Sequence, residues 1–275
     1  MSALPVSDIE SARRTEDVLR ELNLYPLWQL RQAPVRSAVS EVSAGEVAVP
    51  AVSVESQAEH GTIAEPPSVA ASPRVDIAQL NWPQLKKMVQ GCTACKLRAG
   101  CLQTVFGTGD ENAQWLFVGS WPSEDDEAEG EPFSGPAGQL LDNMLAAIGL
   151  KRGSNVYLAN VVKCSGSIQR GPQADEIAQC LPYLARQIQL LQPQIIVALG
   201  HAAATALLGE DRDWNSLLGS VHGYAGLAKD GSAQSIPLVI THHPAALLLT
   251  PLNKAQTWRD LCLARDTMQA DKQAQ

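Results

Sequence analysis

Cysteine is the residue type whose spacing in this sequence points most directly to chemistry. Cys92 and Cys95 form a Cys-x2-Cys pair, and Cys164 and Cys180 follow with fifteen residues between them. Four thiolates gathered in this way could hold a tetrahedral zinc ion or a [4Fe–4S] cluster. The spacing alone does not decide between these two, and a redox pair or simple buried thiols remain open as well.

Other chemistry-bearing residues follow short apolar runs that read as strands. These runs span 115–118, 156–162, 195–199 and 238–241, and helical patterns separate them over about 137–149, 174–192 and 202–208. Short apolar strands that alternate with helices predict an α/β fold, a doubly wound parallel sheet with helices on both faces. Ligand sites in such sheets lie at the carboxyl ends of the strands. Those ends carry Gly119-Ser120-Trp121-Pro122, Asn160 with Cys164, Gly200-His201 and His242-His243-Pro244.

Composition narrows the function classes. The chain has 275 residues, 45% of them hydrophobic, and a net charge of −8 from 21 basic and 29 acidic residues. The nearly apolar stretch 195–209 is too short to span a bilayer, and the acidic N-terminus does not resemble a signal peptide, so a cytoplasmic location is expected. The remaining cysteines, Cys101 and Cys262, are then expected to be ordinary buried thiols. The negative charge disfavours a protein that binds nucleic acid mainly through phosphate contacts.

The chain divides into three parts by composition. Residues 34–78 contain no Leu, Phe, Tyr, Trp, Met, Cys or Lys, which predicts a disordered linker; a strand pair around Val47–Val54 is the alternative. Residues 1–33 before it are predicted to be a docking helix and peptide, and residues 79–275 the folded domain. The peptide carries a dense set of interface anchors: Leu24, Tyr25, Leu27, Trp28, Leu30 and Arg31. These anchors must pack on the chain's own domain or on a partner, and the long linker favours a partner.

The four cysteines, taken with their surroundings, resemble those of the iron–sulfur family-4 uracil-DNA glycosylases. The blocks that carry the resemblance are Val105–Gly107, Pro132–Leu141, Asn160–Cys164, Ile195–Gly200 and His243–Ala246. The resemblance covers roughly residues 90–270. It implies a uracil-DNA-glycosylase-like fold, a [4Fe–4S] cluster rather than zinc, and hydrolysis of the bond between uracil and deoxyribose after the nucleotide has flipped out of the helix.

The same resemblance assigns roles to individual side chains. Phe133 would stack on the flipped base, the Asn160 amide would read its polar edge, and His243 would stabilise the charge that develops on the departing uracil. The residues by themselves also allow plainer roles. Phe133 could be a core residue, Asn160 could cap the end of a strand, and His243 could be a loop histidine.

One loop departs from the family pattern. Where the family has Gly-Glu-Gly/Ala-Pro-Gly after the first strand, this chain has Gly119-Ser120-Trp121-Pro122-Ser123. Ser120 replaces the acidic residue that would help to place water, and Trp121 is expected to fill or reshape the pocket. Arginines of the family are also replaced, by Ser165 and His222, and an acidic run at 124–131 is expected to be a solvated loop. These departures predict lost catalysis and weak or lost DNA binding.

A second resemblance lies in the N-terminal peptide. Leu22–Arg31 is similar to the peptide with which the psi subunit of the bacterial DNA polymerase III clamp-loader complex binds the chi subunit, and the layout of the whole chain looks like the psi subunit of pseudomonad-type bacteria. This resemblance implies chi and clamp-loader subunits as partners. The leading hypothesis is therefore a replication adaptor with a catalytically degenerate glycosylase-like domain. The alternative is an active uracil-DNA glycosylase.

Overall fold

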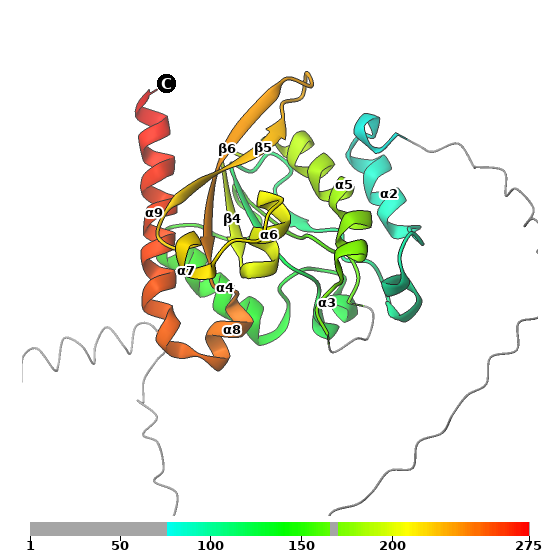
Figure 1. The fold of residues 1–275 in the computed structure, drawn as a ribbon, viewed down its shortest axis with the longest axis horizontal. Coiled ribbons are helices and arrows are strands. Elements are labelled where there is room, and N and C mark those ends of the chain that lie inside the picture. The colour runs from blue at the N-terminus through cyan, green and yellow to red at the C-terminus, as the bar shows by residue number, and fades with distance from the viewer. Residues whose placement is uncertain (1–75, 166–169, 275) are drawn as a thin grey trace, which may run out of the picture. The chain divides into compact units, whose positions relative to one another are not determined.

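A computed structural model describes residues 76–165 and 170–274 of the chain. The predicted docking peptide 1–33 and almost all of the predicted linker 34–78 lie outside the described residues, and so do the peptide anchors Leu24–Arg31. The described residues contain a mixed six-stranded sheet with helices on both faces (Figure 1). The α/β fold predicted from the sequence is confirmed.

Four parallel strands form the centre of the sheet, and an antiparallel strand lies at each edge. The spatial order is β1-β3-β2-β4-β6-β5. The parallel strands are β2 (Trp115–Gly119), β3 (Val156–Asn160), β4 (Ile195–Leu199) and β6 (Ala233–Thr241). The edge strands are β1 (Thr108–Gly109) and β5 (Val221–Leu227). The sequence analysis placed no strand at either edge.

The antiparallel strand β5 has a local cause. The chain returns from β5 to β6 through a short turn in which Ala228 donates a backbone hydrogen bond to Ser232 (2.9 Å) and Gly231 takes a φ of 84°. A connection this short joins antiparallel strands, whereas parallel neighbours need a longer crossover. The doubly wound parallel sheet is therefore correct for the four central strands and incomplete at both edges.

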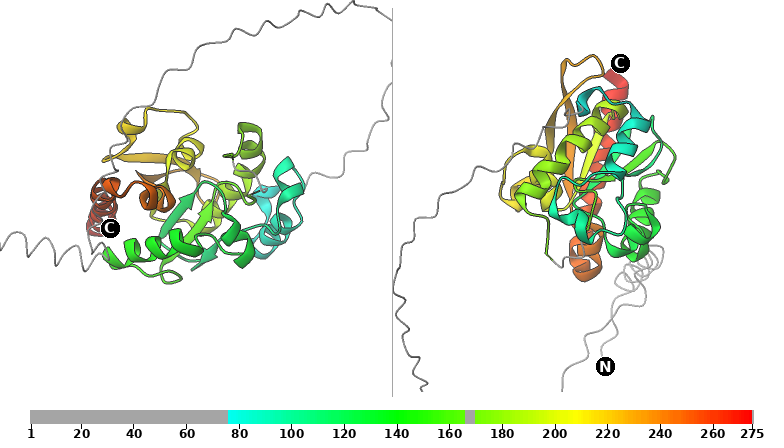
Figure 2. Two further views of the ribbon diagram at one scale, coloured as in Figure 1. Left: turned by 90° about the horizontal axis from the view of Figure 1, so that it is seen from below. Right: turned by 90° about the vertical axis from the view of Figure 1, so that its right-hand side faces the viewer.

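Two apolar cores lie on opposite faces of the sheet, because successive residues of each buried strand point to opposite sides. Leu116 and Val118 of β2 face the core beneath α2 (Trp82–Gln90), α5 (Ala174–Leu191) and α6 (His201–Leu208). Trp115 and Phe117 face the core beneath α4 (Gly135–Ala147), α8 (Pro244–Leu249) and α9 (Lys254–Ala274). Figure 1 shows α9 along one side of the domain and α2 along the other, and Figure 2 shows the same layers from two further directions.

The remaining elements are short helical segments: η1 (Ile77–Gln79), η2 (Lys96–Gly100), α3 (Glu124–Glu129), α7 (Trp214–Leu217) and η3 (Pro251–Asn253). The predicted helices 137–149, 174–192 and 202–208 correspond to α4, α5 and α6 with shifts of one or two residues at their ends. No helix among residues 76–165 and 170–274 is long and apolar enough to cross a membrane.

Candidate functional site

The carboxyl ends of the parallel strands bring three of the predicted site residues together. Gly119 ends β2 and pairs in register with Asn160, which ends β3. His243 follows β6, two strands farther along the sheet. Phe133 comes from the loop between α3 and α4, and its ring centroid lies 5.6 Å from that of His243. The structure therefore places Phe133, Asn160 and His243 at the same end of the sheet, and their roles toward a base stay predictions.

Gly119 is the residue that lets Asn160 and Phe133 approach each other. A Cβ built on Gly119 would overlap Asn160 Oδ1 and would come within 2.6 Å of Phe133 Cζ. Any larger side chain would have to displace the amide or the ring. The backbone at the end of β2 thus lies directly against the side chains that would hold a flipped base.

Phe133 is held in an unusual backbone conformation. Its φ is 59°, in the left-handed region that non-glycine residues rarely adopt. Arg152 stabilises this turn, because its guanidinium donates to the carbonyl oxygens of Pro132 (3.0 Å) and Phe133 (2.9 Å). Strain that is held by such contacts is typical of functional sites. The ring is almost completely buried, so the two alternatives of the sequence analysis are both partly true: Phe133 packs with the core and lines the site.

The Asn160 side chain provides the clearest sign that this site is built for a ligand. Asn160 is 1% exposed, and neither Oδ1 nor Nδ2 has a hydrogen-bond partner among the described residues. A buried amide normally pairs both atoms, since leaving them unpaired costs free energy. The amide does not serve as a strand cap. It remains available to a molecule that offers one donor and one acceptor.

His243 presents a defined proton to the same site. Its Nδ1 accepts a hydrogen bond from the backbone N–H of Ala245 at 3.2 Å, so in the neutral ring the proton is on Nε2. Burial lowers the pKa of His243 from 6.5 to about 4. The imidazole is therefore neutral near pH 7 and offers an N–H donor rather than a positive charge.

Trp121 reaches the surface of the domain. The residue is 38% exposed, and a Cβ built on Gly171 would lie 3.4 Å from its Cη2 atom. Ser120, which precedes it in the chain, is largely buried. The expectation that Trp121 fills or reshapes the base pocket stays a prediction.

The acidic run also differs from the predicted solvated loop. Residues 124–129 form α3, and Asp126 and Glu127 are buried. Asp126 accepts the backbone N–H of Ser134 at 2.6 Å, next to Phe133. Glu127 accepts the N–H groups of Leu102 (3.0 Å) and Ser165 (2.6 Å). Burial alone would raise the pKa of Glu127, but these hydrogen bonds lower it. Part of the run therefore positions the loops around the site.

The four cysteines of the predicted metal site come from separate segments that meet beside α5. Cys92 follows α2, Cys95 precedes η2, Cys164 follows β3, and Cys180 lies in α5. Burial raises the pKa of Cys164, and the thiols of Cys180 and Cys95 raise it further. Burial likewise raises the pKa of Cys180, with contributions from Cys95 and Cys92. Cys180 thus lies near the other three cysteines.

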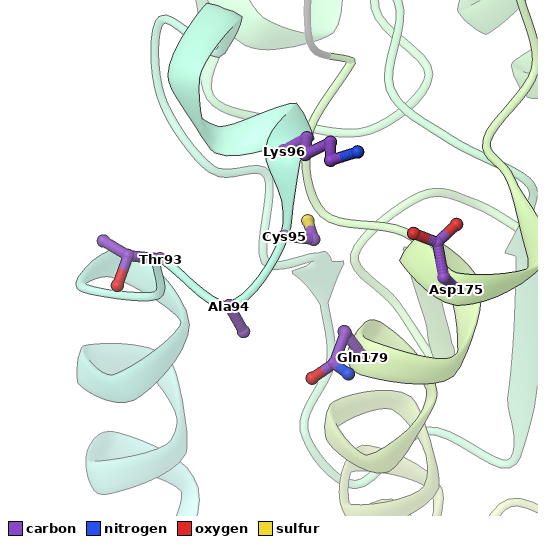
Figure 3. Close-up of a pocket in the computed structure, with 6 residues that line it drawn as sticks. All are labelled: Thr93, Ala94, Cys95, Lys96, Asp175 and Gln179. Carbon is purple, nitrogen blue, oxygen red and sulfur yellow. The ribbon is translucent and has the colours of Figure 1, made fainter. Parts of the chain in front are cut away.

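A cavity of about 390 Å³ opens next to this cysteine group. Figure 3 shows Cys95 on one side of it and Asp175 and Gln179 of α5 on the other. Within the described residues, no three His, Cys, Asp or Glu side chains are gathered tightly enough to hold one metal ion. Four cysteines are the usual ligand set of a [4Fe–4S] cluster, and the same four sulfurs can also bind a tetrahedral zinc ion.

Cys101 is buried, as predicted, whereas Cys262 in α9 is only partly buried. Cys101 is not isolated, because its Sγ donates to the carbonyl oxygen of Gln103 at 3.1 Å and it also hydrogen-bonds Cys164. The sequence analysis also gave no role to Lys163, which is 1% exposed and lies between Asn160 and Cys164. A lysine within an apolar run beside two site residues was the available signal.

Comparison with known proteins agrees with this geometry. The model of the uracil DNA glycosylase superfamily matches residues 106–264. The chain is 36% identical to a type-4 uracil-DNA glycosylase from Pyrobaculum aerophilum over 67% of this chain and 93% of that protein. It is 38% identical to the type-4 enzyme of Sulfurisphaera tokodaii, over 61% of this chain and 76% of that one. For the type-4 enzyme of Thermotoga maritima the identity is 33%, over 62% and 84% of the two chains.

These relatives correct the leading hypothesis of the sequence analysis. A catalytically degenerate adaptor that resembles the psi subunit is contradicted, because several type-4 uracil-DNA glycosylases match the chain at 33% to 38% identity. That hypothesis relied on the replaced residues of the loop after β2, whereas Phe133, Asn160 and His243, at the centre of the site, are all present. The chain belongs to the uracil DNA glycosylase superfamily.

Proposed function

We propose that this protein is an active uracil-DNA glycosylase that removes uracil from DNA and carries a [4Fe–4S] cluster. The observation that carries the proposal is the buried Asn160 amide without a protein partner, beside Phe133 and His243. Uracil offers an N–H donor and a carbonyl acceptor on its pairing edge, and an amide group complements both. The three relatives described above, which are named type-4 uracil-DNA glycosylases, support the same activity.

Each site residue has a separate role in the reaction. The bond between N1 of uracil and C1′ of deoxyribose breaks, and its electron pair goes to the uracil ring. Water supplies a hydroxyl group to C1′, and the proton that the water loses balances the charge of the departing uracil anion. Phe133 offers an aromatic face to the flipped base, and Asn160 holds its edge. The Nε2–H of neutral His243 donates toward the carbonyl oxygen on which negative charge develops.

The four cysteines would hold the cluster, and its role is taken as structural. Cys92 and Cys95 come from the start of the domain, Cys164 follows β3 and Cys180 lies in α5. A cluster bound by all four would tie these segments together and contribute to the stability of the fold. When bound, it supplies cross-links between segments, and no step of the hydrolysis depends on it.

The decisive experiment is excision of uracil from single- and double-stranded DNA by the anaerobically purified full chain. We expect turnover, and we expect Asn160→Ala and His243→Ala to reduce it by about 10²- to 10⁴-fold. The matched controls are Asn112→Ala and His222→Ala, which change the same residue types outside the site. Iron-loaded protein that releases no uracil above background would refute the proposed activity.

Metal analysis tests the cofactor separately. We expect a brown protein with about four irons per chain and no zinc. Replacing any of Cys92, Cys95, Cys164 or Cys180 with serine should lower the iron content, whereas Cys262→Ser should not. One zinc per chain with no iron would refute the cluster and leave the proposed glycosylase activity standing.

A further inference from the structure

Lys163 is a fully buried lysine between the two functional groups of the domain. It is 1% exposed and directly precedes Cys164. Its Nζ donates to the backbone carbonyl of Asn160 and to Oε1 of Gln187, both at 2.7 Å. Gln187 Nε2 in turn donates to the carbonyl of Phe106 at 2.9 Å, which fixes the amide with its oxygen toward Lys163. The ammonium group is therefore held in one position.

The acceptors of this ammonium are neutral. Both are amide or peptide oxygens, and no carboxylate within the described parts of the chain lies within 4.0 Å of Nζ. A buried charge is costly when no opposite charge compensates it, so buried lysines are normally paired. Lys163 thus requires a source of negative charge other than an acidic side chain.

One such source adjoins it in the chain, because Cys164, one of the four cysteines, directly follows Lys163. The positive charge of Lys163 and the negative charge of a Cys180 thiolate attract each other. Four thiolates carry more negative charge than an oxidised four-iron, four-sulfur core carries positive charge. The positive charge of Lys163 and the negative charge that a cluster would bring are therefore of opposite sign and adjacent.

We propose that Lys163 is the internal counter-ion of the cluster and positions the end of β3, so that one side chain connects the cluster to Asn160. This inference rests on the proposed cluster. Through its bond to the Asn160 carbonyl, the ammonium holds the strand end that carries the amide of the base site. Through its charge, it offsets the negative charge of the cluster, and reduction, which adds negative charge, becomes easier.

The test is the reduction potential of the cluster, which a purely structural lysine would not set. We expect Lys163→Met and Lys163→Gln to move the midpoint potential to more negative values, whereas Lys163→Arg, which keeps the charge, stays near the wild-type value. The matched control is Lys151→Met, an exposed lysine in the turn after α4, which should leave the potential unchanged. Potentials are measured by redox titration of the full chain, monitored by electron paramagnetic resonance.

Iron content is determined first and separates the two possible failures. Iron-free wild-type protein would overturn the cluster and this inference together. An iron-loaded Lys163→Met or Lys163→Gln protein with the wild-type potential would overturn the role of Lys163 alone. If the neutral variants lose the cluster while Lys163→Arg retains it at the wild-type potential, the need for charge is supported. Loss of the cluster from Lys163→Arg as well would show that the shape of the lysine side chain is required rather than its charge, and would overturn the proposal.

Discussion

Replacing Asn160 with leucine should stabilise the free protein while it abolishes uracil excision. The leucine side chain has the same number and branching of heavy atoms as asparagine and brings no polar atoms into the site. The Asn160 amide buries one donor and one acceptor without a partner, and each such atom costs about 1 to 3 kcal/mol. Water that enters the site recovers part of this cost. We therefore expect Asn160→Leu to raise the free energy of unfolding by about 1 to 3 kcal/mol.

Thermal unfolding of iron-loaded protein measures this change. For a domain of this size, 1 kcal/mol corresponds to a rise in Tm of about 2 to 4 °C. The matched control is Gln187→Leu, another buried amide, whose oxygen and nitrogen are both paired at 2.7 and 2.9 Å. This control should lower Tm. Excision by Asn160→Leu should fall by about 10²- to 10⁴-fold, because the edge of uracil loses its partners.

The two substitutions must therefore move stability in opposite directions. A loss of more than about 3 kcal/mol in Asn160→Leu would show that the amide is satisfied in the free protein, because crowding by the larger methyl groups alone costs about 1 to 3 kcal/mol. The site would then not be built around an unpartnered amide, even if excision were lost as expected.

Three further outcomes follow from the site. Gly119→Ala should reduce excision by about 10²-fold or more, because its Cβ would overlap Asn160 Oδ1 and come within 2.6 Å of Phe133 Cζ. The control is Gly91→Ala, whose Cβ would meet nothing closer than 3.7 Å. Equal activity of the two variants would contradict the close approach of the Gly119 backbone to these side chains. Stability should fall as the pH drops from 6.5 toward 4, because burial lowers the pKa of His243 to about 4, so that the unfolded chain takes up the proton first. The His243 ring contributes about 2 kcal/mol to this pH dependence of the free energy of unfolding, after allowance for its partial exposure to solvent. In urea titrations at different pH values, the stability of His243→Gln should therefore depend less steeply on pH than that of the wild type. The same dependence in both proteins would place the ring in solvent. Trp121→Gly should change kcat/KM by less than about threefold, and a gain of tenfold or more would show that the indole does obstruct the site.

The elements that sequence reasoning found and missed differ in how they are buried. The strands at 115–118 and 195–199 were predictable because both of their faces are covered, so that every residue is apolar. In the edge strand β5, the exposed residues Val221, Gly223 and Ala225 alternate with residues that are only partly buried. This weak alternation resembles the pattern of a loop. The C-terminal helix α9 buries only a narrow stripe, Leu261, Ala264 and Met268, whose helical spacing was the available signal.

The function was harder to predict than the fold because residue types do not tell where their side chains point. Ser120 and Trp121 differ from the family pattern, and in the sequence they stand next to Gly119, at the centre of the site. In the structure, the Trp121 ring lies at the surface beside Gly171, whereas Asn160 and Phe133 meet at the Gly119 backbone. A substitution in an active-site loop disables an enzyme only when the new side chain reaches the reacting groups or removes a contact that they need. The unpaired amide of Asn160 is a direct property of the site, so it bears more on activity than the replaced neighbours do.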